Sequence, residues 1–151
     1  MNSITYITLE EAIAKHDEII LASGGLLGLR DEGLLISALT MIQNDFYYSE
    51  YHEKLTHLIF SINKNHCFND GNKRASVGLG AIFLMKNGWT NEFIEFFIKK
   101  MEIVSVWLAE KKIGIEELKV FIALLINDLK ENNDYKDHST FIDEINALLK
   151  I

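Results

Sequence analysis

The residues best suited to chemistry lie in one stretch near the middle of the 151-residue chain, His66-Cys67-Phe68-Asn69-Asp70-Gly71-Asn72-Lys73-Arg74-Ala75-Ser76. A histidine, a carboxylate, a glycine and two cations stand within nine residues. The apolar segment that follows, from Ala75 to Met85, predicts a helix buried on all sides. We therefore expect a polar loop that leads directly into the core of the protein.

The turn at Asn69-Asp70-Gly71 is expected to place the start of that helix near Gly71 or Asn72. The first amides of a helix lack internal partners and lie at the positive end of its dipole. Gly71 would let a ligand approach the backbone, and Lys73 and Arg74 would add charge at the rim, where arginine can bind phosphate through two parallel hydrogen bonds. The pattern predicts an anion pocket at Gly71, Asn72, Lys73 and Arg74.

Two further side chains give this pocket catalytic potential. Asp70 is the only carboxylate in the stretch, and beside a polyphosphate it suits magnesium, which takes one or two carboxylates together with phosphate oxygens and water. His66 lies four residues earlier and could accept a proton from an attacking hydroxyl. Phe68 is expected to point into the core and hold the loop. Together these residues favour phosphate chemistry on a hydroxyl group.

Other interpretations of these residues fit less well. The P-loop pattern Gly-x-x-x-x-Gly-Lys-Ser/Thr is absent. An EF-hand register would put His66 and Phe68 at ligand positions and Val77 in place of the final glutamate. His16-Asp17 resembles the metal pair of HD-type phosphohydrolases, but no earlier histidine completes that pattern. We therefore assign no chemistry to Cys67, nor to the remaining histidines, which we take as surface or interhelical residues: His16, His52, His57 and His138.

The sequence before the motif predicts helices. Proline is absent, and apolar residues recur at helical spacing. A capping box at Thr8-x-x-Glu11 begins a first helix, which ends at Ser23-Gly24-Gly25. Its apolar face consists of Leu9, Ala12, Ile13, His16 and Ile20. In Arg30-Asp31 we see a turn and an N-cap for the next helix rather than a catalytic element.

Apolar stripes predict a helix from His52 to the motif and two more helices around residues 93–108 and 118–129. Residues 44–51 differ, because they combine polar and aromatic side chains without a helical stripe. We expect this segment to be an exposed excursion or a short hairpin. Its aromatic residues are Phe46, Tyr47, Tyr48 and Tyr51.

Composition limits the class of protein. With 48% hydrophobic residues, a chain of this length can bury about 70% of the surface that its unfolded form exposes. The net charge of −7 argues against direct binding of nucleic acid or of anionic membranes. The single cysteine, the absence of a signal-peptide pattern and the absence of a membrane-length apolar run favour a cytoplasmic protein.

The motif resembles the signature of the Fic/Doc (Fido) superfamily, His-x-Phe-x-Asp/Glu-Gly-Asn-x-Arg. Lys73 stands where the AMP-transferring Fic branch has glycine, so the stretch is similar to the death-on-curing (Doc) branch. Three further segments are similar to Doc-like proteins: His16 to Leu39, Phe83 to Trp89, and Glu110 to Phe121. The resemblance therefore covers most of residues 1–127.

This resemblance implies a compact all-α bundle in which the motif joins two central helices. It also implies the roles of the motif residues: His66 as general base, Asp70 as magnesium ligand, and Gly71, Asn72, Lys73 and Arg74 around the phosphates of ATP, with Arg74 also taking part in catalysis. For the Doc branch the implied reaction is transfer of the terminal phosphate of ATP to a Ser or Thr hydroxyl of a target protein. Transfer of AMP, as in Fic enzymes, and a non-catalytic helical binding module are the alternatives.

The family also suggests partners. It matches the aromatic segment at Phe46, Tyr47, Tyr48 and Tyr51 with a flap that clamps an extended target segment by strand addition. Doc-like proteins are typically held inactive by an antitoxin, so we expect a toxin of a toxin–antitoxin pair and a partner protein that inhibits it.

We predict a catalytic domain at residues 1–130, and a linker with an accessory helix at residues 131–151. Some Fic proteins silence themselves with a helix that carries Ser/Thr-x-x-x-Glu-Gly/Asn. Here Thr140-x-x-x-Glu144 is followed by Ile145 instead of Gly or Asn. We therefore favour a packing or dimerisation helix over self-inhibition through Glu144.

Overall fold

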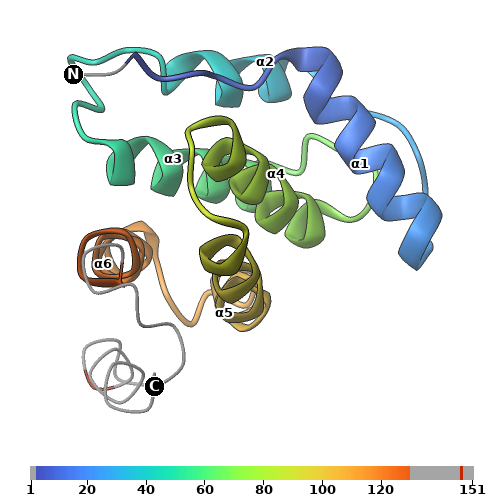
Figure 1. Cartoon of the computed structure of the whole chain (residues 1–151). Helices are drawn as coiled ribbons and strands as arrows, with labels where there is room; N and C mark the ends of the chain where they lie inside the picture. The colour runs from blue at the N-terminus through green and yellow to red at the C-terminus, as the bar shows by residue number, and fades with distance from the viewer. Residues whose placement is uncertain (1–2, 130–146, 148–151) are drawn as a thin grey trace.

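The computed structural model describes residues 3–129 and residue 147, and the predicted linker and accessory helix lie almost wholly outside this part. Within residues 3–129 the chain forms six α-helices and a short π-helical segment, with no strand (Figure 1). This confirms the all-α prediction. The helices are α1 (Leu9–Ser23), α2 (Glu32–Met41), α3 (Tyr51–Asn65), α4 (Asn72–Lys86), α5 (Asn91–Ala109) and α6 (Ile115–Leu124), followed by η1 (Leu125–Leu129).

The local signals at the start of the chain are where the sequence predicts them. Thr8 and Glu11 form a reciprocal capping box, in which Glu11 N donates to Thr8 Oγ1 at 3.2 Å and Thr8 N donates to Glu11 Oε1 at 3.0 Å. Asp31 caps α2, because its Oδ1 accepts from Leu34 N at 3.1 Å. These caps fix the first turns of α1 and of α2.

Helices α3 and α4 form the centre of the bundle. They run antiparallel and are joined by the short motif loop, while α1 and α5 pack against α4 and α2 and α6 pack against α3 (Figure 1). At Gly80 the helices approach so closely that an added Cβ would lie 3.0 Å from Ile59 Cδ1 and 3.3 Å from Phe97 Cε1. The core therefore has no room for a side chain at that position.

Helix α4 is buried along most of its length, as its composition predicts, although Met85 near its end is 59% exposed.

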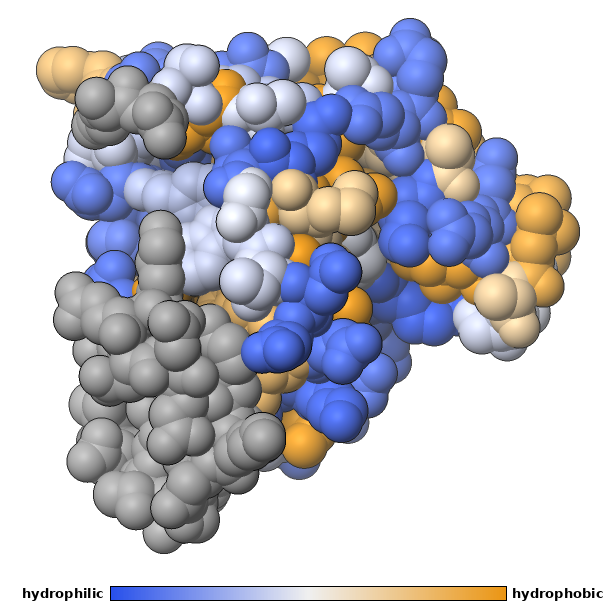
Figure 2. All heavy atoms as spheres, viewed as in Figure 1, coloured by the Kyte–Doolittle hydropathy of each residue, from blue (hydrophilic) through white to orange (hydrophobic). Residues whose placement is uncertain are grey.

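Among the described residues, no helix is long and apolar enough to cross a membrane. Figure 2 shows hydrophobic side chains on the surface at the end of the molecule where α1 ends and the next loop begins. Three leucines of that region are exposed: Leu21, Leu26 and Leu27.

Candidate active site

The predicted base lies where α3 ends. His66 is the C-cap of α3 and has a left-handed backbone, with φ of 52°. A non-glycine residue adopts this conformation at a cost of about 1–2 kcal/mol, so its surroundings must hold it there. Arg30 does so, because its Nε donates to His66 O at 2.5 Å and its Nη2 donates to Asn65 O at 2.9 Å. The imidazole itself remains exposed.

The loop between α1 and α2 lies along the motif loop. Asn69 N donates to Gly28 O at 3.0 Å, and Leu29 and Phe68 form an isolated antiparallel bridge. The amides of Arg30 and Asp31 both donate to Cys67 O, at 2.8 and 3.0 Å. Residues 24–31 therefore act as a backbone brace that sets the path of the motif loop.

A buried histidine on α1 also holds the motif loop in place. His16 is 1% exposed, and its ring stacks on Phe68 with centroids 3.8 Å apart and an interplanar angle of 2°. Its Nε2 lies 2.7 Å from Asp70 O. A carbonyl oxygen can only accept, so Nε2 carries the proton and donates. Phe68 points into the core as predicted. Of the two alternatives given for His16, surface or interhelical, its burial excludes the surface one, and the residue positions the motif.

The carboxylate of Asp70 is held by two backbone amides. Leu26 N donates to its Oδ2 at 3.0 Å and Gly71 N donates to its Oδ1 at 2.8 Å. These hydrogen bonds, with a further contribution from the nearby Arg74 guanidinium, keep the pKa of Asp70 below its ordinary value. Gly25 must be small here, because an added Cβ would lie 2.5 Å from Asp70 Oδ2 and its φ is +125°. The group is thus ionised and fixed in direction.

The helix that follows offers free amides at its start. Gly71, with φ of 74°, is the N-cap of α4, and no side chain caps this end. The side chain of Asn72 turns back to the loop, where Nδ2 donates to Phe68 O and Oδ1 accepts from Phe68 N, each at 3.0 Å. Asn72 therefore contributes to the predicted anion pocket through its backbone amide, not through its side chain. Uncapped amides at a helix N-terminus are suited to an anion.

Arg74 connects the anion pocket to the end of α1. Its Nη1 donates to Ser23 Oγ and to Gly24 O, the latter at 2.8 Å. A guanidinium carries five N–H donors, so Nε and Nη2 remain for a ligand. Lys73, next to it in the first turn, is exposed. The arginine is thus oriented before any ligand arrives, while the lysine is free to adjust.

All six motif residues that the sequence assigns to catalysis or phosphate binding line one pocket of about 550 Å³. Asn63, Lys64, Asn69 and Ala109 complete its wall. Within the described residues, no group of three or more His, Cys, Asp or Glu side chains could hold a metal without other ligands. The single fixed carboxylate of Asp70 fits a magnesium ion that takes most of its ligands from phosphates and water. The structure therefore brings together His66, Asp70, Gly71, Asn72, Lys73 and Arg74.

The aromatic segment matched with a flap lies elsewhere. It precedes α3, whereas His66 follows α3, and a helix of 15 residues separates its two ends by about 22 Å. Figure 1 shows the two segments at opposite ends of that helix. The structure thus does not bring Phe46, Tyr47 or Tyr48 to the pocket. The segment that borders the motif is residues 24–31, for which the sequence predicts only a helix end at Gly24-Gly25 and a turn and cap at Arg30-Asp31.

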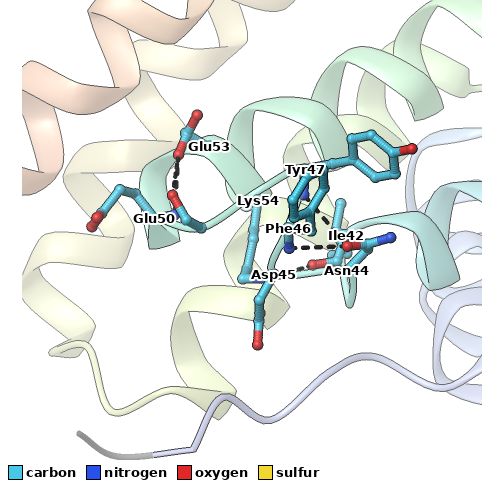
Figure 3. Close-up of polar contacts among 9 residues, drawn as sticks. Ile42, Asn44, Asp45, Phe46, Tyr47, Glu50, Glu53 and Lys54 are labelled. Atoms are coloured by element: carbon cyan, nitrogen blue, oxygen red, sulfur yellow. Dashed lines mark hydrogen bonds and ion pairs between the residues drawn. The ribbon is translucent and has the colours of Figure 1, made fainter.

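The aromatic segment is also not a hairpin. Residues 45–47 form a turn, in which Asn44 Oδ1 accepts from the amides of Phe46 and Tyr47 at 2.9 and 3.4 Å (Figure 3). These donors are used within the turn, so strand addition at Phe46 and Tyr47 would first have to break them. Tyr51 does not belong to the segment, because it begins α3, stacks on Phe83 and donates to Phe83 O at 3.0 Å.

A buried lysine anchors this turn. Lys54 is fully buried, and its Nζ donates to Ile42 O and to Asp45 Oδ1, both at 2.7 Å. Burial disfavours the ammonium, but the contacts with Asp45 and Tyr6 outweigh this effect, and the pKa of Lys54 is raised.

Cys67, within the motif, is buried too, and burial raises the pKa of its thiol to about 11. Neither Lys54 nor Cys67 is suited to chemistry at the pocket.

Comparison with known proteins agrees with the geometry. The model of the Fic/DOC family matches residues 6–84, which include α1, the brace, the motif loop and most of α4. The chain belongs to the Fic/DOC family. One relative is Protein kinase doc of Escherichia phage P1, which is 34% identical over 87 residues, covering 55% of this chain and 68% of the relative. This likeness supports the Doc branch that Lys73 predicts.

Proposed function

We propose that this Fic/DOC protein is a transferase that moves the terminal phosphate of ATP to a Ser or Thr hydroxyl of a target protein. The observation that carries the proposal is the pocket in which the uncapped start of α4, the cations Lys73 and Arg74, and the fixed carboxylate of Asp70 face His66. The name of the phage relative, a protein kinase, supports phosphate transfer. Family membership supports the broader class of transferase.

Each group in the pocket has a separate role. The amides at the start of α4 and the free donors of Arg74 bind and orient the phosphates. Phosphoryl transfer depends mainly on such positioning and on the neutralisation of charge, so the protein needs little covalent chemistry of its own. Asp70 would hold magnesium, whose charge would offset that of the phosphates. His66 accepts the proton of the attacking hydroxyl. The oxygen–phosphorus bond to the target forms as the bond to the β-phosphate oxygen breaks, and ADP leaves.

The target segment would lie beside the brace rather than beside the aromatic turn. Leu26 and Leu27 of the brace are 67% and 50% exposed, and the amide of Leu26 is bonded to Asp70. A target that covers these leucines would bring its hydroxyl close to the pocket. Regulation by an inhibitory partner protein, which the family suggests, is part of the same proposal.

The test is to incubate the protein and magnesium with a cell extract and ATP labelled at either the α- or the γ-phosphate. We expect γ label on protein, none from α label, and the loss of labelling in His66→Ala but not in the matched control His52→Ala. Protein that carries α label would show AMP transfer instead. Magnesium-dependent ATP binding without any transfer would favour a binding module.

A further inference from the structure

Asn63 lines the pocket and has an unused hydrogen-bond acceptor. It lies in the last turn of α3, is 2% exposed and lines the pocket that contains the motif. Its Nδ2 donates to Ser105 O of α5 at 3.1 Å, whereas its Oδ1 is buried and has no partner among the described residues. A buried polar atom without a partner costs about 1–3 kcal/mol. Such an atom beside a binding pocket indicates a ligand group that completes it.

The orientation of this amide follows from its neighbour. Ser105 O is a carbonyl oxygen and can only accept, so the nitrogen of Asn63 must face it. Turning the amide over would set two oxygens against each other. The atom that Asn63 offers to a ligand is therefore the oxygen, and it needs a donor.

The need for a hydrogen-bond donor determines which part of a nucleotide can contact Asn63 Oδ1. Ionised phosphate oxygens accept hydrogen bonds and would repel an amide oxygen, so they belong at the other side of the pocket, at the start of α4. A cationic donor is disfavoured, because the Lys64 ammonium lies on the same wall, where it donates to Leu108 O at 3.1 Å. The remaining donors are neutral N–H and O–H groups, which a nucleoside carries as the exocyclic amine of its base and as the hydroxyls of its ribose.

We propose that Asn63 Oδ1 accepts a hydrogen bond from the nucleoside of the bound nucleotide and is a specificity-determining residue of the pocket. This assignment rests on the proposed function, since it takes the phosphates to lie at the start of α4. It places the nucleoside against the wall that α3 and α5 form around Asn63, Lys64 and Ala109. The exocyclic amine and a ribose hydroxyl are the two sources of the same donor.

Calorimetric titration with magnesium tests the assignment. The ligands are ATP, 2′-deoxy-ATP, 3′-deoxy-ATP, the purine analogue that lacks the amine, and inorganic tripolyphosphate. In the wild type, one donor-deleted analogue should bind about tenfold more weakly than ATP. Asn63→Leu should bind ATP about tenfold more weakly and should no longer distinguish ATP from that analogue. The analogue concerned identifies the donor.

Two controls separate this role from a structural one. Tripolyphosphate should bind Asn63→Leu and the wild type equally, because it has no nucleoside. Asn65→Ala removes an exposed amide from the same turn of α3 and should change neither affinity.

If the wild type binds all nucleotides equally, the assignment is overturned, whether or not the variant folds. The same holds if a folded Asn63→Leu still distinguishes them. A wild type that binds neither ATP nor tripolyphosphate would overturn the proposed function itself and the assignment with it.

Discussion

His16 is the residue whose replacement tests most directly how the motif loop is held. In His16→Ala the hydrogen bond to Asp70 O and the stacking on Phe68 are both lost, at a position that is 1% exposed. The hydrogen bond contributes about 1 kcal/mol and the aromatic pair about 1 kcal/mol. The cavity and the unpaired carbonyl add to this, so we expect unfolding to become easier by about 2–4 kcal/mol.

Urea denaturation followed by circular dichroism measures this loss. With a slope of about 2 kcal/mol per molar urea, the midpoint should fall by about 1–2 M. His16→Phe keeps a stacking ring but not the donor, and should lose about half as much. His52→Ala, at the half-buried start of α3, is the matched control and should shift the midpoint by less than about 0.5 M.

Replacement of His16 should also weaken ligand binding at the pocket. Without the bond to its carbonyl, Asp70 is less well fixed, so both His16 variants should bind magnesium–ATP more weakly even where they remain folded. If His16→Ala were no less stable than His52→Ala, the ring would not be holding the loop, and its assigned positioning role would be wrong.

Substitutions in the brace, in the motif loop and in the turn before α3 have distinct expected effects. Gly25→Ala should be at least about 1 kcal/mol less stable in urea than Gly24→Ala, because both glycines have positive φ but only Gly25 would bring a Cβ against Asp70. Hydrogen bonding lowers the pKa of Asp70, so the stability that it contributes is complete above about pH 4 and is lost as the pH falls through its folded-state pKa; Asp70→Asn should flatten this acid limb of the unfolding free energy. Asp45→Ala should cost about 1–3 kcal/mol, because it leaves the buried Lys54 ammonium with the Ile42 carbonyl but without its carboxylate. A cost below about 0.5 kcal/mol in urea denaturation would contradict this role of Asp45. Cys67 should react with iodoacetamide at neutral pH only after unfolding, since its thiol is buried and has a pKa of about 11.

The parts of the fold that depend on neighbouring residues could be predicted from the sequence. The capping box at Thr8, the N-cap at Asp31 and the start of a helix at Asn72 all follow from residue type and spacing over a few positions. The pocket is predictable for the same reason, because its six motif residues are close in sequence and a helix start necessarily brings their backbone together.

The elements that hold the pocket from outside could not be predicted in this way. The brace at residues 24–31 contacts the motif largely through backbone hydrogen bonds. Such bonds do not depend on the type of residue, so they cannot be recognised from the sequence. The family resemblance places the flap at the aromatic segment, but whether that segment reaches the pocket depends on the direction of α3. His16 did carry a signal, since a histidine within the apolar stripe of α1 must find a partner in the core.

The contacts between α3 and α5 limit which fragments of this protein can be expressed on their own. The region that matches the family ends at residue 84, before the end of α4 and ahead of all of α5. Yet α5 provides the carbonyls that hold Asn63 and Lys64, and Phe97 packs against Gly80. A fragment made from the matched region alone would contain every motif residue but would expose the core faces of α3 and α4 to water. The segment by which the family is found is thus smaller than the unit that must be expressed to study it.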